Sequence, residues 1–126
     1  MIRPGNLLVA KAATGVSSPE FVGDMDKTVF TLHTTASCNA TVKFVGGFKD
    51  APVFSTASSN TNDWHYIEVV NVDDGSVIDG STGVAMTGTD FNTAYMANVD
   101  KLKWIGAVVT AYSAGAINVS FTSFAA

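Results

Sequence analysis

The sequence predicts an all-β fold, an antiparallel β-sandwich of jelly-roll-like type, from three observations. Nine of the eleven acidic residues are aspartate, whose short side chain competes with a helical backbone and favours turns. Valine and threonine are abundant, and both are stiff, β-branched residues that favour strands. Clusters of Asp, Asn, Gly and Ser recur along the chain at intervals close to those of a sandwich of short strands.

The length of 126 residues suits one compact domain. We expect residues 21–126 to form a single β-sandwich domain. Residues 1–20 lack a clear alternation of apolar and polar side chains, so they are predicted to form an N-terminal arm or an edge segment, with a short strand candidate at 7–12. The predicted strands therefore belong to one core.

Two strands are predicted in the first half of the chain from alternating side chains. The first covers residues 28–34, with Phe30 and Leu32 facing the core. The second covers residues 40–45, with Val42 and Phe44 inward and Lys43 outward. Residues 51–63, rich in Ser, Thr and Asn, are predicted to form a surface loop.

The middle of the chain contains shorter candidates. Residues 64–72 form an apolar, strand-favouring run that ends at the turn sequence 73–76, Asp-Asp-Gly-Ser, before Val77 and Ile78. Another short strand is predicted at 84–86. Residues 90–102 leave two predictions open, because apolar side chains recur there at helical spacing behind a possible Asp90 cap. This stretch forms either a strand or one short helix near residues 90–99.

The C-terminal third has the clearest pattern. Residues 102–112 are apolar at both odd and even positions, which is typical of a strand covered on both faces. Ile117, Val119 and Phe121 then alternate with polar residues, as in a strand with one face in water. Gly115 suits the left-handed position of a short hairpin loop, so these two strands are predicted to pair as a hairpin.

Charge and composition exclude several classes of protein. Seven Lys and Arg stand against eleven Asp and Glu, for a net charge of −4, and charged residues are only 14% of the chain. Scattered basic residues leave no stripe that could follow a phosphate backbone, so no nucleic-acid partner is expected. A disordered tail and a coiled coil are also excluded. No stretch approaches the roughly 18 apolar residues of a membrane span, and no membrane partner is expected.

The single cysteine, Cys38, cannot form an internal disulfide, which suits a reducing compartment. The apolar run near the N-terminus is broken early by Pro4 and Gly5 and is too short for a secretion signal. The protein is therefore expected to be synthesised and folded in a cytoplasm.

No catalytic residue, cofactor or metal site is predicted. The only histidines, His33 and His65, are predicted to be surface residues of strands, and Cys38 fits a small buried thiol. The acidic pairs in 24–26 and 73–74 are explained by turns, and two carboxylates in a cluster are few for a calcium site. We therefore expect a protein that is not an enzyme.

Aromatic residues at alternating strand positions suggest a second possibility. Such residues can form a stacking platform for sugars, although core or subunit-interface positions are commoner. A glycan-binding or cell-surface-binding module is therefore kept as the alternative function. The aromatic candidates are Trp64, Tyr66, Tyr95, Trp104 and Tyr112.

Hydrophobicity is the most informative property for function. The mean hydropathy is +0.25, and a single sandwich of this size buries only about two thirds of its unfolded surface. Much apolar surface would therefore stay in water unless other chains cover it, so we predict self-association. The predicted interface residues are Trp104, Ile105, Val109, Phe121 and Phe124.

Parts of the chain resemble small β-sandwich structural proteins of tailed bacteriophages, such as capsid decoration (cement) proteins and head or tail accessory proteins. The similar elements are the strand 41–44 (TVKF) followed by Gly46 and Gly47, the strand at Trp64, and the stretch 102–115 (LKWIGAVVTAYSAG) before a final strand. The resemblance covers about residues 28–124.

This resemblance implies a virion component without enzymatic activity. Such a protein assembles as a homo-oligomer, with a trimer favoured, and its partner is the major capsid protein or another virion protein. Its expected location is the virion, after synthesis in the host cytoplasm.

Overall fold

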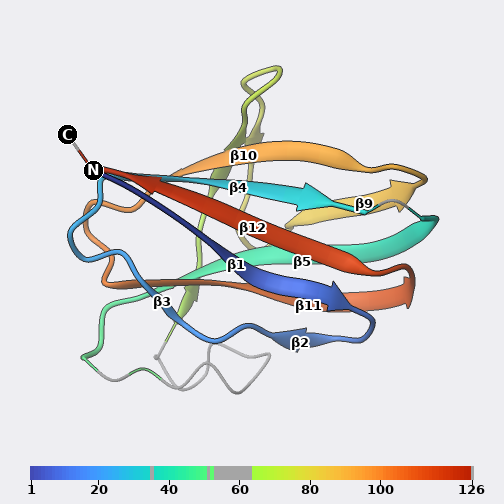
Figure 1. Cartoon of the computed structure of the whole chain (residues 1–126), viewed down its shortest axis with the longest axis horizontal. Coiled ribbons are helices and arrows are strands. Elements are labelled where there is room, and N and C mark those ends of the chain that lie inside the picture. The colour runs from blue at the N-terminus through green and yellow to red at the C-terminus, as the bar shows by residue number, and fades with distance from the viewer. Residues whose placement is uncertain (35, 51, 53–63, 126) are drawn as a thin grey trace.

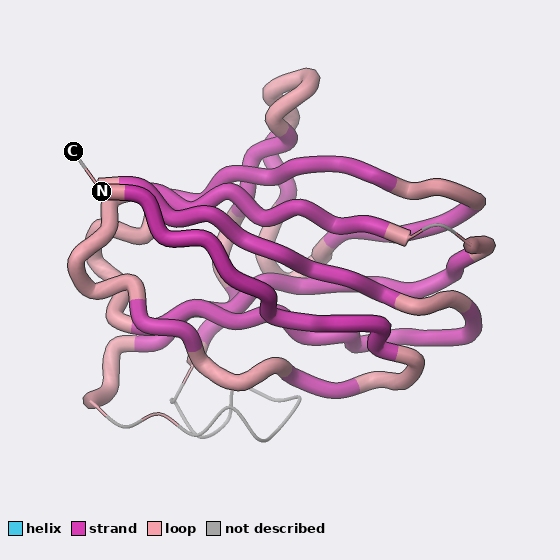
Figure 2. Tube along the Cα trace, viewed as in Figure 1, coloured by secondary structure: helices cyan, strands magenta, loops and turns pink. Residues whose placement is uncertain are grey.

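A computed structural model describes residues 1–34, 36–50, 52 and 64–125. Every regular element in this part of the chain is a β-strand, and the strands form two sheets packed face to face (Figures 1 and 2). This arrangement confirms the all-β sandwich predicted from the sequence. No helix capable of crossing a membrane is found among the described residues.

The first sheet has six antiparallel strands. Strand β1, which includes most of the short strand predicted at 7–12, lies at one edge of this sheet. The short β8 lies at the other edge. In spatial order the strands are β1 (Ile2–Lys11), β12 (Ile117–Phe124), β4 (Lys27–His33), β10 (Asn92–Asn98), β7 (Val69–Asn71) and β8 (Val77–Ile78).

The second sheet is built around two long strands, β11 and β5, which pair over most of their length. Shorter strands extend it on both sides, so residues 1–20 supply edge strands to both sheets. The main order is β2 (Gly15–Val16), β11 (Trp104–Ala114), β5 (Cys38–Gly47) and β6 (His65–Tyr66), with β3 (Glu20–Phe21) on β11 and β9 (Val84–Gly88) on β5.

Alternating side chains of both sheets fill the core between them. Phe30 of β4 stacks on Phe44 of β5, with ring centroids 4.3 Å apart, which joins the two layers by aromatic contact. A buried hydrogen bond of 2.7 Å links Thr28 Oγ1 and Ser123 Oγ on adjacent strands. The polar groups at this end of the core are therefore satisfied within the sheet.

Residues 92–98 form strand β10, so the alternative of a short helix over residues 90–99 is wrong. The helix prediction is based on Phe91, Tyr95, Val99 and Leu102, of which the first three are four residues apart. A spacing of four keeps side chains on one face of a strand as well as on one side of a helix. Pairing with β4 and β7 decides the outcome, and Asp90, with φ of 55°, ends the preceding turn instead of capping a helix.

The predicted hairpin between the last two strands is also wrong. Strands β11 and β12 are consecutive in the chain but belong to different sheets, because β11 pairs with β5 and β12 pairs with β1 and β4. Gly115 does have a positive φ, of 102°, but its turn carries the chain from one layer to the other. Alternation of side chains predicts a strand and its buried face, but not its partner.

The apolar run 64–72 divides between the two sheets. Its first part pairs with β5 as β6, and its last part pairs with β10 as β7. Ile67 and Glu68 connect them. The predicted surface loop at 51–63 lies outside the described residues, apart from Pro52.

Candidate interaction surfaces

One row of paired residues crosses all six strands of the first sheet on its outer face. Five of its six residues are apolar, and three of them are exposed: Pro4, Met96 (36%) and Val77 (61%). We call this set the apolar row. Its members, from β1 to β8, are Pro4, Thr122, Val29, Met96, Val70 and Val77.

A hollow of about 400 Å³ lies beside the apolar row, at the end of the face where β12 finishes. Phe124, which is 39% exposed, forms part of its wall, and Val29 and Met96 belong to both the hollow and the row. We call it the Phe124 hollow. Its lining residues are Asp26, Lys27, Val29, Met96, Phe124 and Ala125.

The opposite end of the same face is polar. Asn118, His33 and Asn92 are directly paired across β12, β4 and β10, and His33 and Asn92 are exposed. His33 is therefore a surface residue of a strand, as predicted. The face thus divides into an apolar end and a polar end along the direction of its strands.

The β7–β8 hairpin stands out from the body of the sandwich (Figure 1). Two exposed valines flank its turn, Val72 (54%) and Val77 (61%), and the turn itself carries Asp73 and Asp74. Gly75, at φ of 74°, donates its N–H to the carbonyl of Asn71 at 2.9 Å.

Side chains hold this turn in one conformation. Asn71 Oδ1 accepts the N–H of Asp73, and Asp74 Oδ1 accepts the N–H of Ser76, both at 2.8 Å. The hydrogen bonds to Ser76 hold the pKa of Asp74 below its usual value, so its negative charge is secured at neutral pH. The hairpin tip is a preorganised, acidic projection with apolar sides.

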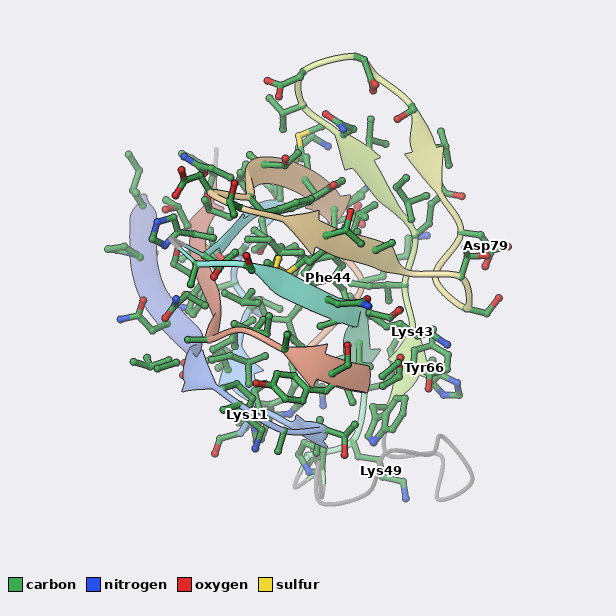
Figure 3. All side chains as sticks on the ribbon, turned by 90° about the vertical axis from the view of Figure 1, so that its right-hand side faces the viewer. Lys11, Lys43, Phe44, Lys49, Tyr66 and Asp79 are labelled. Atoms are coloured by element: carbon green, nitrogen blue, oxygen red, sulfur yellow. The ribbon has the colours of Figure 1, made fainter. Side chains whose placement is uncertain are left out.

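The outer face of the second sheet carries aromatic side chains. Phe21 meets Trp104 edge to face at 5.3 Å, and Trp104 Nε1 donates to the carbonyl of Lys49 at 2.8 Å. Lys43 points away from the core, unlike its neighbour Phe44, and its Nζ lies 4.8 Å from the ring centroid of Tyr66 (Figure 3). These contacts fix the rings in place.

The chain itself covers part of this second face. Val45, Trp64 and Val108 are buried there, behind the partly buried Tyr66 and Trp104. Strand β11 is therefore apolar on both faces because each face has an intramolecular neighbour. Part of the apolar surface that the sequence predicts to be exposed is therefore buried within a single chain.

The five predicted interface residues do not form one surface. Ile105, Val109 and Phe121 lie inside the core between the sheets, so they are not available to a partner. Trp104 is partly buried on the outer face of the second sheet, whereas Phe124 is exposed at the hollow of the first. These last two lie on different sheets.

Sequence reasoning missed two exposed contributors to the apolar face of the first sheet. Met96 and Val77 were not among the candidates. Met96 was missed because residues 90–102 had two open predictions, and only a strand places Met96 opposite the buried Tyr95 and Ala97. Val77 lies in a strand of two residues, which is too short to show alternation.

The remaining candidates for chemistry lie apart from one another. Cys38 is buried, and this burial raises the pKa of its thiol, which lowers its reactivity. His65 is exposed on β6. In the described part of the chain, no three His, Cys, Asp or Glu side chains gather at one point where a metal could bind.

An ion pair closes one end of the sandwich. Arg3 of β1 donates two hydrogen bonds to the carboxylate of Asp24, at 2.9 and 3.1 Å, and a third to the carbonyl of Phe21 at 3.0 Å. The guanidinium holds the pKa of Asp24 below its usual value. Asp24 therefore serves as a partner of β1 in this structure.

Comparison with known proteins finds no matching family model and no match among curated protein sequences. Two solved structures share the fold. The SPBc2 prophage-derived protein YomS superimposes with a TM-score of 0.72 over 98% of this chain and 92% of its own, at 11% sequence identity. The PBSX exported protein XepA gives a TM-score of 0.66 over 97% of this chain, at 16% identity.

The chain corresponds to 38% of the length of XepA, whereas it spans nearly all of YomS. At these sequence identities the likeness establishes a common fold.

Proposed function

We propose that this chain is a non-enzymatic structural protein of a tailed phage that self-associates and binds the capsid surface as a decoration protein. The observation that carries this proposal is the apolar end of the outer face of the first sheet, where a row across six strands meets the Phe124 hollow. Exposed apolar areas of this kind mark interaction surfaces. The fold shared with a prophage-derived protein supports the phage association.

In this proposal the protein is part of the virion, and a trimer is the favoured assembly. Its partner is the major capsid protein or another virion protein. Its apolar face would be covered in the assembly, while the polar end with Asn92 and His33 stays in water. Such a division of one face allows a protein to dock in a defined orientation.

Strand β10 offers a matched pair of variants to test self-association. Met96 and Asn92 are both exposed, lie on the same face and are four residues apart. We expect Met96→Lys to shift native mass spectra from oligomer to monomer, because it places a charge in the apolar row. Asn92→Lys should leave the oligomer unchanged, and a monomeric unmodified protein would contradict the proposal.

The capsid role has its own test. Purified protein added to undecorated shells should bind them and raise their resistance to heat and to osmotic shock. Met96→Lys should bind less, whereas Asn92→Lys should behave as the unmodified protein. Failure of the unmodified protein to bind or protect shells would exclude decoration and leave self-association to be judged by its own experiment.

Recognition of a glycan or a cell surface is the second candidate function. It is favoured by the aromatic side chains on the outer face of the second sheet, especially Phe21, which is 45% exposed, beside Trp104. Flat rings fixed by neighbours can stack on sugars. Trp64 and Tyr95 are buried and are removed from this candidate platform.

A glycan array with the unmodified protein, Phe21→Ala and Trp104→Ala tests this second candidate. Phe124→Ala serves as a matched control, because Phe124 is an exposed aromatic residue on the other sheet. Loss of a glycan signal in the first two variants alone would support it. Absence of any signal with the unmodified protein would contradict it.

A further inference from the structure

We propose that copies of this chain assemble head to tail, with the β7–β8 hairpin of one copy inserted into the Phe124 hollow of the next. The inference rests on the proposed self-association and specifies its contact. Each copy carries both halves of this contact, the hairpin and the hollow, on the same sheet. A second copy of the chain is therefore a sufficient partner.

The hairpin presents an apolar surface that its own chain leaves in water. Val72 and Val77 are more than half exposed, and the turn between them stands away from the sandwich (Figure 1). The hydrogen bonds of Asn71 and Asp74 hold the turn in one shape. A projection that is already ordered loses little conformational entropy on binding.

The hollow has complementary chemistry. Val29, Met96 and Phe124 supply apolar walls, and its volume of about 400 Å³ lies within the range of pockets that accept several side-chain-sized groups. Transfer of a valine side chain from water into the hollow lowers the free energy of the complex. Insertion would bury apolar surface on both copies at one contact.

Charge complementarity supports the same occupant. The hairpin turn carries Asp73 and Asp74, and Lys27 lines the hollow. Lys27 makes no ion pair with any residue that the structure describes, and the same holds for the Asp73 side chain. Asp26 also lines the hollow but takes part in other interactions of its own chain. The free lysine is therefore matched by a free aspartate on the hairpin.

A contact between two different surfaces of one protein is heterologous, and it closes into a ring when the rotation between copies allows it. The expected assembly is therefore built from repeated hairpin-to-hollow contacts. Each variant that damages one half of the contact leaves the other half intact.

Valines of matched exposure provide the first test. Val77→Lys should weaken association at least tenfold in analytical ultracentrifugation, because lysine at this site replaces the apolar side chain that enters the hollow. Val9, on β1, is 71% exposed, and Val9→Lys should leave association unchanged. Thermal unfolding of each variant checks that the fold is retained.

Exchange of charges provides the second test. Asp73→Lys and Lys27→Asp should each weaken association by bringing like charges together, and the double variant should restore most of the loss. Rescue in the double variant is specific to a contact between these two positions. Two independent, additive losses would overturn the proposed contact.

A mixing experiment provides the third test and separates this inference from the proposed function. Val77→Lys keeps an intact hollow, and Met96→Lys keeps an intact hairpin, so a mixture should form a 1:1 complex in native mass spectra. If Met96→Lys abolishes association while Val77→Lys does not, self-association through the face stands and the hairpin contact is overturned. A monomeric unmodified protein would overturn both.

Discussion

Gly115 is required by two features of the turn that carries the chain from β11 to β12. Its φ of 102° is rare for residues with a side chain, and a Cβ there would lie 2.7 Å from Cys38 Cβ and 2.9 Å from Cys38 Cα. Because the second atom belongs to the backbone, the neighbour cannot simply rotate away. Both strain and collision therefore oppose any other residue.

Alanine substitutions at two glycines separate these effects. Gly75 has a positive φ of 74° but no atom within 4 Å of an added Cβ. We expect Gly75→Ala to lower the free energy of unfolding by about 1 kcal/mol, from backbone strain alone. Gly115→Ala should lower it by about 3 kcal/mol, because crowding adds to the strain. Urea unfolding measures both, and equal losses would show that the collision is relieved elsewhere.

The Arg3–Asp24 ion pair predicts a dependence of stability on pH. The pKa of Asp24 is lower in the folded protein because Arg3 donates hydrogen bonds to its ionised carboxylate. A lowered folded pKa contributes stability that is fully present above the unfolded pKa, about 3.9, and is lost as pH falls through the folded pKa.

We therefore expect Asp24→Asn to lower the melting temperature at pH 7, with the difference from the unmodified protein shrinking as pH falls below about 4. The effect should be small, because both side chains are exposed to solvent. Asp100→Asn is the control, since Asp100 is exposed, has no ion pair among the described residues and does not line the Phe124 hollow. A difference that is the same at pH 7 and pH 2.5 would argue against the ion pair as its source.

At the scale of single elements, strands with strict alternation could be predicted from the sequence. In β4 and β5 the residues assigned to the core, including Phe30 and Phe44, are buried. Alternation predicts them because the inward face of a strand has a period of two residues. The same rule placed Lys43 on the outside, where it meets Tyr66 (Figure 3).

Pairing partners could not be predicted in the same way. Nothing in the side chains of β11 and β12 shows that they belong to different sheets, because hydrogen-bond partners of a strand are backbone groups of distant residues. The apolar face of the first sheet could therefore be predicted only in part. Phe124 was predicted from its apolar surroundings near the C-terminus, whereas Met96 needed the strand assignment of β10 and its pairing with Val29 and Val70.

Strand β1 contains a backbone irregularity at which a substitution should increase the stability of the fold. Ala10 has a positive φ of 48°, at a point where the register of β1 against β12 shifts between Leu8 and Lys11. A left-handed conformation costs a residue with a Cβ about 1–2 kcal/mol, and glycine avoids this cost at the expense of greater unfolded-state entropy.

We expect Ala10→Gly to raise the free energy of unfolding by about 0.5 kcal/mol, as the difference of these two effects. Ala85→Gly is the control, because Ala85 is an exposed alanine in a regular strand. It should lower stability by about 0.5–1 kcal/mol. Chemical denaturation compares the two, and destabilisation by both substitutions would show that Ala10 is not strained.

At the scale of the whole molecule, the mean hydropathy of +0.25 has two structural sources. One is intramolecular, since β5 and β11 are covered on both faces and the second sheet hides Trp64 behind Tyr66 and Trp104. The other is the apolar end of the first sheet with the exposed hairpin valines. The second source leaves apolar side chains in water, and it is the surface on which the proposed association depends.

This division leads to a prediction about thermal stability. If association covers the apolar end of the first sheet, folded copies are stabilised by mass action, and the melting temperature rises with protein concentration. We expect a continuous rise over a hundredfold range of concentration for the unmodified protein and for Asn92→Lys. Met96→Lys should show a melting temperature independent of concentration, because its charge opposes burial of the row. Differential scanning fluorimetry at several concentrations measures this, and a flat response of the unmodified protein would mean that the sandwich gains no stability from its neighbours.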